Sequence, residues 1–321
     1  MANVYHIPAM LTETIEGLNI KPEGVYVDVT FGGGGHSRAI LRRMDEIKNE
    51  KLEIKNCGQL FSFDQDADAV ANAIDDERWT FVHSNFRYLR NWMDYYGVEG
   101  IDGLLADLGV SFHHFDCPER GFSFRFSAPL DMRMNQTAKR TAADIVNGYS
   151  EEELAKVLWL YGELKNGRQV AKNICKARAQ KPILRTEELV EVAYPHPLPK
   201  RRGAEIEVPA QYKKDLARMF QALRIEVNDE MGALREMLVA ARDLLKPGGR
   251  IAILTYHSLE DRLVKNFLRS GNLEGTIEKD FYGNALTPFD VIEKGREAST
   301  DEVERNPRSR SAKLRVAEKK S

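Results

Sequence analysis

Cysteine is scarce in this chain, and the three that are present, Cys57, Cys117 and Cys175, lie far apart. They form no C-x-x-C pair, which argues against a zinc site or a redox motif, and their odd number does not suggest a disulfide framework. We therefore expect no metal site and a reducing, cytoplasmic environment. At 321 residues the chain is long enough to bury a sizeable core without cross-links.

Long hydrophobic runs are also absent. No apolar stretch approaches the roughly 20 residues that a membrane-spanning helix needs. Residues 1–10 lack the apolar core of a secretory signal. These two absences lead us to expect no association with a membrane.

An excess of charge of one sign is missing as well, because 47 Lys and Arg residues nearly balance 49 Asp and Glu residues. The net charge of −2 therefore gives no argument for a nucleic-acid partner. Basic residues do gather locally, at Lys200–Arg202 and in the tail beyond Asn306. Such clusters can bind an anionic partner or can be ordinary solvated surface, and the sequence leaves both interpretations open.

The first third of the chain alternates short apolar runs with helical segments. The segments at 37–44 and 67–74 have helical patterns. The apolar runs predict buried strands at 25–30, 60–64, 80–83 and 101–108. Strands separated by helices indicate crossover connections and a parallel sheet, so we expect an α/β fold.

The alternation stops between residues 111 and 219, where helices are expected instead. We predict them at 150–161, 168–180 and 186–193, followed by a loop at 195–209. Ser150 with Glu153 has the pattern of a capping box, and Thr186 is the expected cap of the third helix.

The α/β pattern then resumes. A long helix is predicted at 220–245, ending at the sequence Lys246-Pro-Gly-Gly249. A strand at 250–256, a helix at 258–269 and a late strand at 314–318 follow it. We therefore predict one domain formed by residues 1–111 and 219–321, interrupted by a mainly helical substrate-recognition domain at 112–218.

Four consecutive glycines follow the first predicted strand, in Asp28-Val-Thr-Phe-Gly-Gly-Gly-Gly-His-Ser37. Open α/β sheets bind ligands at the carboxyl ends of their strands, and glycines there let the backbone approach a ligand closely. A simple tight turn is the alternative. Because four glycines in a row lose much conformational entropy on folding, we favour a ligand-binding loop.

The ligand of this loop is not expected to be a dinucleotide. The G-x-G-x-x-G fingerprint fails in both registers, because Ser37 or Arg38 occupies the sixth place. Asp28, just before the loop, would repel a pyrophosphate but attract the ammonium group of S-adenosylmethionine. Asp64, which ends the second predicted strand, is suited to accept hydrogen bonds from ribose hydroxyls or, alternatively, to be an acid at a helix N-terminus.

Further motifs extend this pattern along nearly the whole chain. They are His6-Ile-Pro-Ala-Met-Leu-Thr-Glu13, Asp102-Gly-Leu-Leu-Ala-Asp-Leu-Gly-Val-Ser111, Arg120-Gly-Phe-Ser-Phe124, Pro129-Leu-Asp-Met-Arg-Met134, Phe220-Gln-Ala-Leu-Arg-Ile-Glu-Val-Asn228, His257-Ser-Leu-Glu-Asp-Arg262 and Asn306-Pro-Arg-Ser-Arg-Ser311. Together with the glycine loop they resemble the bacterial small-subunit ribosomal RNA (cytosine-N4)-methyltransferases, the RsmH or MraW family. An ordered set of this size is far more specific than a lone glycine loop.

The resemblance implies a class I S-adenosylmethionine-dependent methyltransferase (Rossmann-like) fold with an inserted helical domain. It also implies methylation of the exocyclic N4 amine of a cytidine in the decoding region of 16S rRNA, within a small ribosomal subunit or its precursor. The implied cofactor contacts are Gly34, Gly35, His36, Asp64, Phe86 and Asp107, to which the loop itself adds Asp28 and Gly32. His114 stands where the family usually has Gln.

Asp107 is the expected catalytic group. An exocyclic cytosine amine is a poor nucleophile, and a carboxylate at the end of the fourth strand could accept its hydrogen bond and then its proton. Asp107 could instead be only a cofactor contact, because the Asp-Pro-Pro-Tyr pattern of amino-methyltransferases reads Asp107-Leu-Gly-Val here. His257, after the fifth strand, is a second catalytic candidate, although helix capping by Ser258 with Asp261 would explain much of its motif.

A cytosine must leave its stack to be methylated, and aromatic faces would hold it. The aromatic candidates are Phe112, Phe115, Phe122, Phe124 and Phe126, although a Phe at every second position is equally typical of a strand in a core. The proposed RNA contacts are Phe122, Phe124, Arg125, Arg133, Arg308 and Arg310.

Two alternative functions remain open from the sequence. One is S-adenosylmethionine-dependent methylation of another substrate, DNA or protein. The other is a non-enzymatic ribosome-assembly factor that retains the fold, against which the intact glycine loop, Asp64 and Asp107 argue. A homodimer is compatible with the sequence, which does not specify the oligomeric state.

Overall fold

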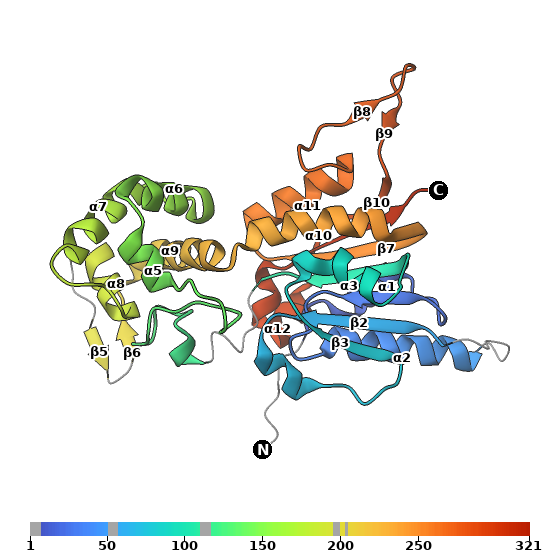
Figure 1. The fold of residues 1–321 in the computed structure, drawn as a ribbon, viewed down its shortest axis with the longest axis horizontal. Coiled ribbons are helices and arrows are strands. Elements are labelled where there is room, and N and C mark those ends of the chain that lie inside the picture. Colours follow the sequence, from blue (N-terminus) through green and yellow to red (C-terminus); the bar gives the residue numbers. More distant parts are fainter. Residues whose placement is uncertain (1–7, 51–56, 110–116, 195–199, 203–204) are drawn as a thin grey trace. The chain divides into compact units, whose positions relative to one another are not determined.

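The computed structural model describes residues 8–50, 57–109, 117–194, 200–202 and 205–321. The chain forms two compact units. The sheet unit comprises Met1–Gly109 and Met231–Ser321, and the helical unit comprises Val110–Glu230. Figure 1 shows the elements of each.

The sheet unit is built on seven strands in the order β10-β11-β7-β4-β1-β2-β3. Their bounds are β1 Val25–Asp28, β2 Gln59–Asp64, β3 Trp79–His83, β4 Ile101–Asp107, β7 Leu245–Thr255, β10 Phe289–Glu297 and β11 Lys313–Lys319. β1 pairs in parallel with β2 and β4, as do β2 with β3 and β4 with β7, whereas β11 is antiparallel to both β7 and β10. This topology confirms the expected α/β class I methyltransferase fold.

Side chains of the central strands alternate between two hydrophobic clusters, which explains their nearly continuous apolar sequences. Val27, Leu104 and Ile253 pack on one face. That face is covered by α3 Leu89–Tyr95, α10 Glu230–Leu244 and α11 Ser258–Ser270. Tyr26 and Leu105 pack on the other, against α1 Leu11–Leu18 and α2 Gly35–Glu50. The central strands are therefore buried on both faces, and the polar groups at the ends of β2 and β4 are partly accessible.

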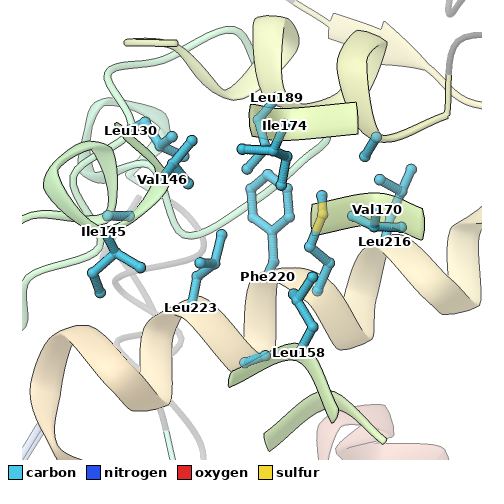
Figure 2. Close-up of a cluster of buried hydrophobic side chains, with 14 of the residues drawn as sticks. Leu130, Ile145, Val146, Leu158, Val170, Ile174, Leu189, Leu216, Phe220 and Leu223 are labelled. Atoms are coloured by element: carbon cyan, nitrogen blue, oxygen red, sulfur yellow. The ribbon is translucent and has the colours of Figure 1, made fainter. Parts of the chain in front are cut away.

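The helical unit holds α5 Ala142–Gly148, α6 Glu151–Gly162, α7 Gly167–Arg178, α8 Thr186–Ala193 and α9 Ala210–Asn228, with a short hairpin of β5 Lys200–Arg202 and β6 Glu205–Glu207. One side of α9 carries Leu216, Phe220 and Leu223, spaced as on one face of a helix. Figure 2 shows these side chains in the core of the unit, with Phe220 facing Ile174 and Leu189. The unit thus has a hydrophobic core of its own.

Two helix predictions were wrong. The single helix expected at 220–245 is two helices, because Asp229 adopts a left-handed conformation with φ 47° between α9 and α10. The helix expected at 67–74 is the 3-10 helix η1, Ala67–Asn72. The strand β10 was not predicted, since its alternating charged residues, as in Glu293-Lys-Gly-Arg-Glu297, resemble a surface segment.

The division of the chain also differs from the expected boundary at residue 219. That position lies inside α9, whose apolar side packs in the helical unit, and the units divide at Glu230. The expected loop at 195–209 contains β5 and β6.

Helix capping follows the prediction at Ser150 but not at Thr186. The Ser150 side chain accepts the Glu153 N–H, and the Glu153 carboxylate accepts the Ser150 N–H at 2.7 Å. At α8 the backbone N–H of Arg185 donates to Glu188 instead, at 3.1 Å. In the described parts of the chain, no helix combines the length and apolarity needed to cross a bilayer.

Candidate active site

The glycine loop joins β1 to α2, and side chains outside the loop donate hydrogen bonds to its backbone carbonyls. The guanidinium of Arg38 donates to the Gly33 carbonyl at 2.7 Å, and the amide of Asn72 donates to the Gly32 carbonyl at 3.1 Å. A Cβ on Gly34, which has φ 73°, would lie 2.8 Å from the ring of Phe31. At Gly32, with φ 50°, a Cβ would meet no described atom within 4 Å. The loop is therefore tightly packed at Gly34 and has open space beside Gly32.

Asp64 connects the end of β2 to this loop. Its carboxylate accepts the backbone N–H of Gly32 at 2.8 Å and that of Asp66 at 2.9 Å. The carboxylate is partly exposed and lies beside the open space at Gly32. The position suits an acceptor for hydroxyl groups beside the loop.

Asp28, which the sequence suggested as a partner for the ammonium group of the cofactor, has no exposed surface. Its side chain is fully buried and accepts the hydroxyl of Ser37 at 2.6 Å and the backbone N–H of Thr30 at 3.1 Å. Ser37 also shares a hydrogen bond with Ser62 on β2, at 2.8 Å. Burial raises the pKa of Asp28, although His36 opposes the shift. Asp28 thus fastens the loop to the first turn of α2 rather than meeting a ligand ammonium directly.

His36 lies in the first turn of α2 and is almost completely buried. Its Nε2 is 3.2 Å from the carbonyl oxygen of Ala9, and its Nδ1 is 3.7 Å from Oδ2 of Asp107. Burial lowers the pKa of His36, and the nearby Asp28 opposes the shift. His36 is therefore a neutral imidazole near neutral pH, and its contact with Asp107 is not an ion pair.

Asp107 ends β4 beside the glycine loop. Its backbone N–H donates to the Thr30 hydroxyl at 2.7 Å, and its Oδ1 accepts the hydroxyl of Tyr256 at 2.6 Å. The side chain keeps 14% of its surface exposed, so the carboxylate is close to buried but reachable. The structure thus brings together His36 and Asp107 as expected, and adds Tyr256.

Tyr256 is the group in this cluster that was not predicted. It directly follows β7, and β4 and β7 are adjacent parallel strands in which Asp107 pairs with Leu254. Its position was recognisable in principle, since an acid and a tyrosine that end neighbouring strands meet at one edge of the sheet. The sequence motif begins at His257, one residue after Tyr256, so Tyr256 was not among the predicted site residues.

Phe86 begins the 3-10 helix η2, Phe86–Tyr88, after β3. It is half-buried and packs against the hydrophobic cluster formed with α10 and α11. The segment is joined to β2 by the Ser84 N–H, which donates to the carbonyl of Asp64 at 2.9 Å. Phe86 and Asp64 are thus held on adjacent strand ends.

His257 caps α11. Its Nδ1 accepts the backbone N–H of Glu260 at 3.4 Å, and its Nε2 is 3.0 Å from Oε1 of the same residue. The expected capping box of Ser258 with Asp261 is wrong, because Asp261 instead binds the guanidinium of Arg315 at 2.8 Å. Helix capping therefore accounts for His257, and the geometry gives no support for a catalytic role.

Most of the predicted RNA-binding residues in the helical unit contact other residues of that unit. Phe122 is buried in the core, and Phe124 packs edge-on against Phe220 with ring centroids 5.8 Å apart. The guanidinium of Arg133 donates two hydrogen bonds to Asp131, at 2.7 and 2.8 Å. The core interpretation of the phenylalanines therefore holds for Phe122.

The remaining candidates differ in accessibility. Arg125 is exposed, as are Arg308 and Arg310 in the sheet unit's 3-10 helix η4, Pro307–Ser311. His114, Phe112 and Phe115 lie outside the described residues. The exposed arginines are therefore the predicted RNA-binding residues that an anionic partner can reach from solvent.

Comparison with known proteins places the chain in a family. A family model described as the MraW methylase family matches residues 3–320. Three relatives carry the name ribosomal RNA small subunit methyltransferase H. The protein of Phocaeicola vulgatus is 57% identical over 99% of this chain and 98% of its own length. That of Parabacteroides distasonis is 58% identical over 98% and 97%, and that of Bacteroides thetaiotaomicron is 56% identical over 98% of each. With nearly every residue covered by the family model, this chain belongs to the MraW methylase family.

Proposed function

We propose that the protein transfers a methyl group from S-adenosylmethionine to the exocyclic N4 amine of a cytidine in the decoding region of 16S rRNA. The observation that carries this proposal is the full-length identity of 56–58% to proteins named ribosomal RNA small subunit methyltransferase H. The substrate is the small ribosomal subunit or its precursor, met in the cytoplasm.

The residues at the sheet edge fit S-adenosylmethionine. The open space at Gly32 admits a ligand close to the backbone, and the Asp64 carboxylate beside it is suited to ribose hydroxyls. Two partly exposed carboxylates, Asp64 and Asp107, favour a ligand with an ammonium and a sulfonium over one with phosphates. Asp28, being buried, supports this preference only by shaping the loop.

The bound cofactor supplies the methyl group and its own leaving group, so the protein has to position and desolvate the amine. The Asp107 carboxylate accepts a hydrogen bond from the cytosine amine and thereby favours a lone pair directed at the methyl carbon. S-adenosylmethionine held beside Gly32 and Asp64 would supply the methyl group, and its sulfur would keep the electrons of the broken C–S bond. The surplus amine proton then passes to Asp107.

The helical unit is proposed as the substrate-recognition domain. The support is its separate core, which makes it an independent body, and the exposed Arg125 on its surface. In the sheet unit, exposed Arg308 and Arg310 offer guanidinium groups to RNA phosphates. Such contacts fix the position of the RNA without reading its sequence.

The test adds the purified protein and S-adenosylmethionine with a tritiated methyl group to an extract of a strain that lacks the protein. The measurement is which molecule in the extract receives the label. Label in 16S rRNA that maps by mass to N4-methylcytidine supports the proposal. Label in DNA or in protein would establish the alternative methyltransferase. If the folded protein labels nothing and binds neither S-adenosylmethionine nor its demethylated product, the remaining function is that of a non-enzymatic ribosome-assembly factor that retains the fold.

A further inference from the structure

The hydroxyl of Tyr256 contacts the one carboxylate that the proposed chemistry needs. It donates a hydrogen bond to Oδ1 of Asp107 at 2.6 Å, a short distance typical of a hydroxyl bound to an ionised carboxylate. The other oxygen, Oδ2, lies on the side of His36, 3.7 Å from its Nδ1. The two oxygens of Asp107 therefore have different neighbours.

The ring of Tyr256 is fixed by the residues around it. Gly109, two residues beyond Asp107, has φ 110°, and a Cβ on it would lie 3.2 Å from Cδ2 of the ring. The absence of a side chain at Gly109 thus lets the ring lie against the segment that follows β4. The backbone N–H of Tyr256 donates to Oε2 of the buried Glu260 at 3.1 Å, which holds the start of α11 to the end of β7.

The backbone of Asp107 is held from the opposite side, through its N–H bond to Thr30. With both backbones anchored, the contact between the hydroxyl and Oδ1 determines how the carboxylate is rotated about its Cβ–Cγ bond. A carboxyl group has a broad torsional minimum at this bond, so a single strong hydrogen bond can select its orientation.

The ionisation of the neighbouring groups keeps this contact intact near neutral pH. Burial, and next the charge of Asp107, raise the pKa of Tyr256 well above its usual value, so the phenol retains its proton. The buried His36 is neutral because its pKa is lowered. The charges of Asp28, Glu260 and Glu302 also act on this cluster, and the last two disfavour a phenolate.

We propose that Tyr256 is a positioning residue for methyl transfer, whose hydroxyl holds Oδ1 of Asp107 so that Oδ2 is presented to the amine of the target cytosine. This inference rests on the proposed function. It assigns Tyr256 a role in kcat rather than in cofactor binding, because the hydroxyl acts on the acceptor of the amine hydrogen bond and proton.

The experiment compares wild type, Tyr256→Phe and a control, Tyr149→Phe, in methylation of unmethylated small ribosomal subunits. The control removes the same kind of bond, since the Tyr149 hydroxyl donates to Oε1 of Glu226 at 2.6 Å in the helical unit. We expect kcat of Tyr256→Phe to fall about tenfold to hundredfold, as for a small misplacement of a reacting group. We expect its KM for S-adenosylmethionine, and its calorimetric affinity for the demethylated product, to stay within about threefold of wild type.

A double-mutant cycle with Asp107→Asn tests whether Tyr256 acts through Asp107. If it does, Tyr256→Phe costs little further activity once Asp107 has been replaced, because the two effects are not additive. Additive losses, an unchanged kcat, a cofactor affinity that falls as far as kcat, or an equal loss in Tyr149→Phe would each overturn the inference.

Two further outcomes complete the design. If Tyr256→Phe does not fold, Gly109→Ala keeps the hydroxyl but displaces the ring and strains the backbone at φ 110°, so full activity of that variant would overturn the inference. A wild-type protein that methylates no ribosomal RNA would instead remove the proposed function, and the role of Tyr256 with it.

Discussion

Residues of the sequence motifs differ in accessibility between the carboxyl edge of the sheet unit and the core of the helical unit. At the sheet edge, the Asp64 carboxylate accepts a backbone N–H and the Asp107 carboxylate accepts the Tyr256 hydroxyl, yet both side chains remain partly exposed. In the helical unit, the equally conspicuous Phe122 and Phe124 pack into or against the core. The difference shows that carboxylates at the strand ends stay accessible to a ligand, whereas the motif phenylalanines of the helical unit contribute to packing.

Topology is the physical reason for this contrast. Parallel strands all end at one edge, so residues distant in sequence are brought together there whatever the details of packing. Helices in a bundle have no such common edge, and the direction of each side chain depends on the whole core. The following predictions test the contrast, beginning with the largest expected effect.

Asp107→Ala is expected to have the largest effect on methylation. Loss of a general base typically lowers the rate by a factor of about 100 to 10,000. The measurement is tritium transfer to 16S rRNA, paired with calorimetry of the demethylated cofactor. Loss of cofactor binding in parallel with turnover would reduce Asp107 to a cofactor contact, and full activity would exclude both roles.

The α/β fold and its strand ends could be predicted from the sequence because each strand is a local apolar run. The glycine loop, Asp64 and Asp107 are therefore recognisable from the sequence alone. The break between α9 and α10 is not, since Asp229 is a residue with no local signal for a left-handed conformation beyond its short polar side chain. Continuous helical periodicity on both sides conceals it.

Three features of the site depend on properties that the sequence does not give. The sequence gives the position of a residue along a strand or helix but not its burial, so it could not show that Asp28, expected to meet the cofactor ammonium, is fully buried. His257 appeared catalytic because it follows a strand, yet its ring faces Glu260. Tyr256 was missed although it ends a strand next to that of Asp107, because the distance between the two side chains follows only from the register of β4 and β7.

Phe124→Ala tests the packing side of the contrast. Because Phe124 is half-buried against Phe220, we expect unfolding free energy to fall by about 1–3 kcal/mol, less than the 3–5 kcal/mol typical of a fully buried Phe. The measurement is urea unfolding alongside methylation at a temperature where the variant stays folded. A large loss of ribosomal RNA methylation with unchanged stability would show that Phe124 meets the substrate and would break the contrast.

Replacing Arg308 and Arg310 by Gln tests whether exposed arginines of η4 bind phosphates. For each guanidinium that neutralises a phosphate in the wild type, we expect its replacement to make the slope of log K against log salt concentration shallower by roughly 0.7–0.9. The measurement is binding to 16S rRNA at several salt concentrations. Arg42→Gln is the control, because this exposed arginine lies on α2 beside Glu46. An RNA affinity that does not respond to salt in the wild-type protein would contradict the phosphate contacts.

The smallest effect is expected from the protonation of His36. Its pKa is lowered by burial, so the unfolded chain binds the proton more readily than the folded one. The sign follows directly: stability is retained above the unfolded pKa of about 6.5 and falls as pH decreases below it, by at most about 1.4 kcal/mol per pH unit. Urea unfolding at pH 7.5 and at pH 5.5 measures this loss in the wild type and in His36→Asn. Asp28 shifts in the opposite direction and would partly mask the effect, because its raised pKa removes stability as pH rises. The difference between the two proteins therefore reports His36 together with its effect on Asp28, and an equal loss in both would show that folding does not lower the pKa of His36.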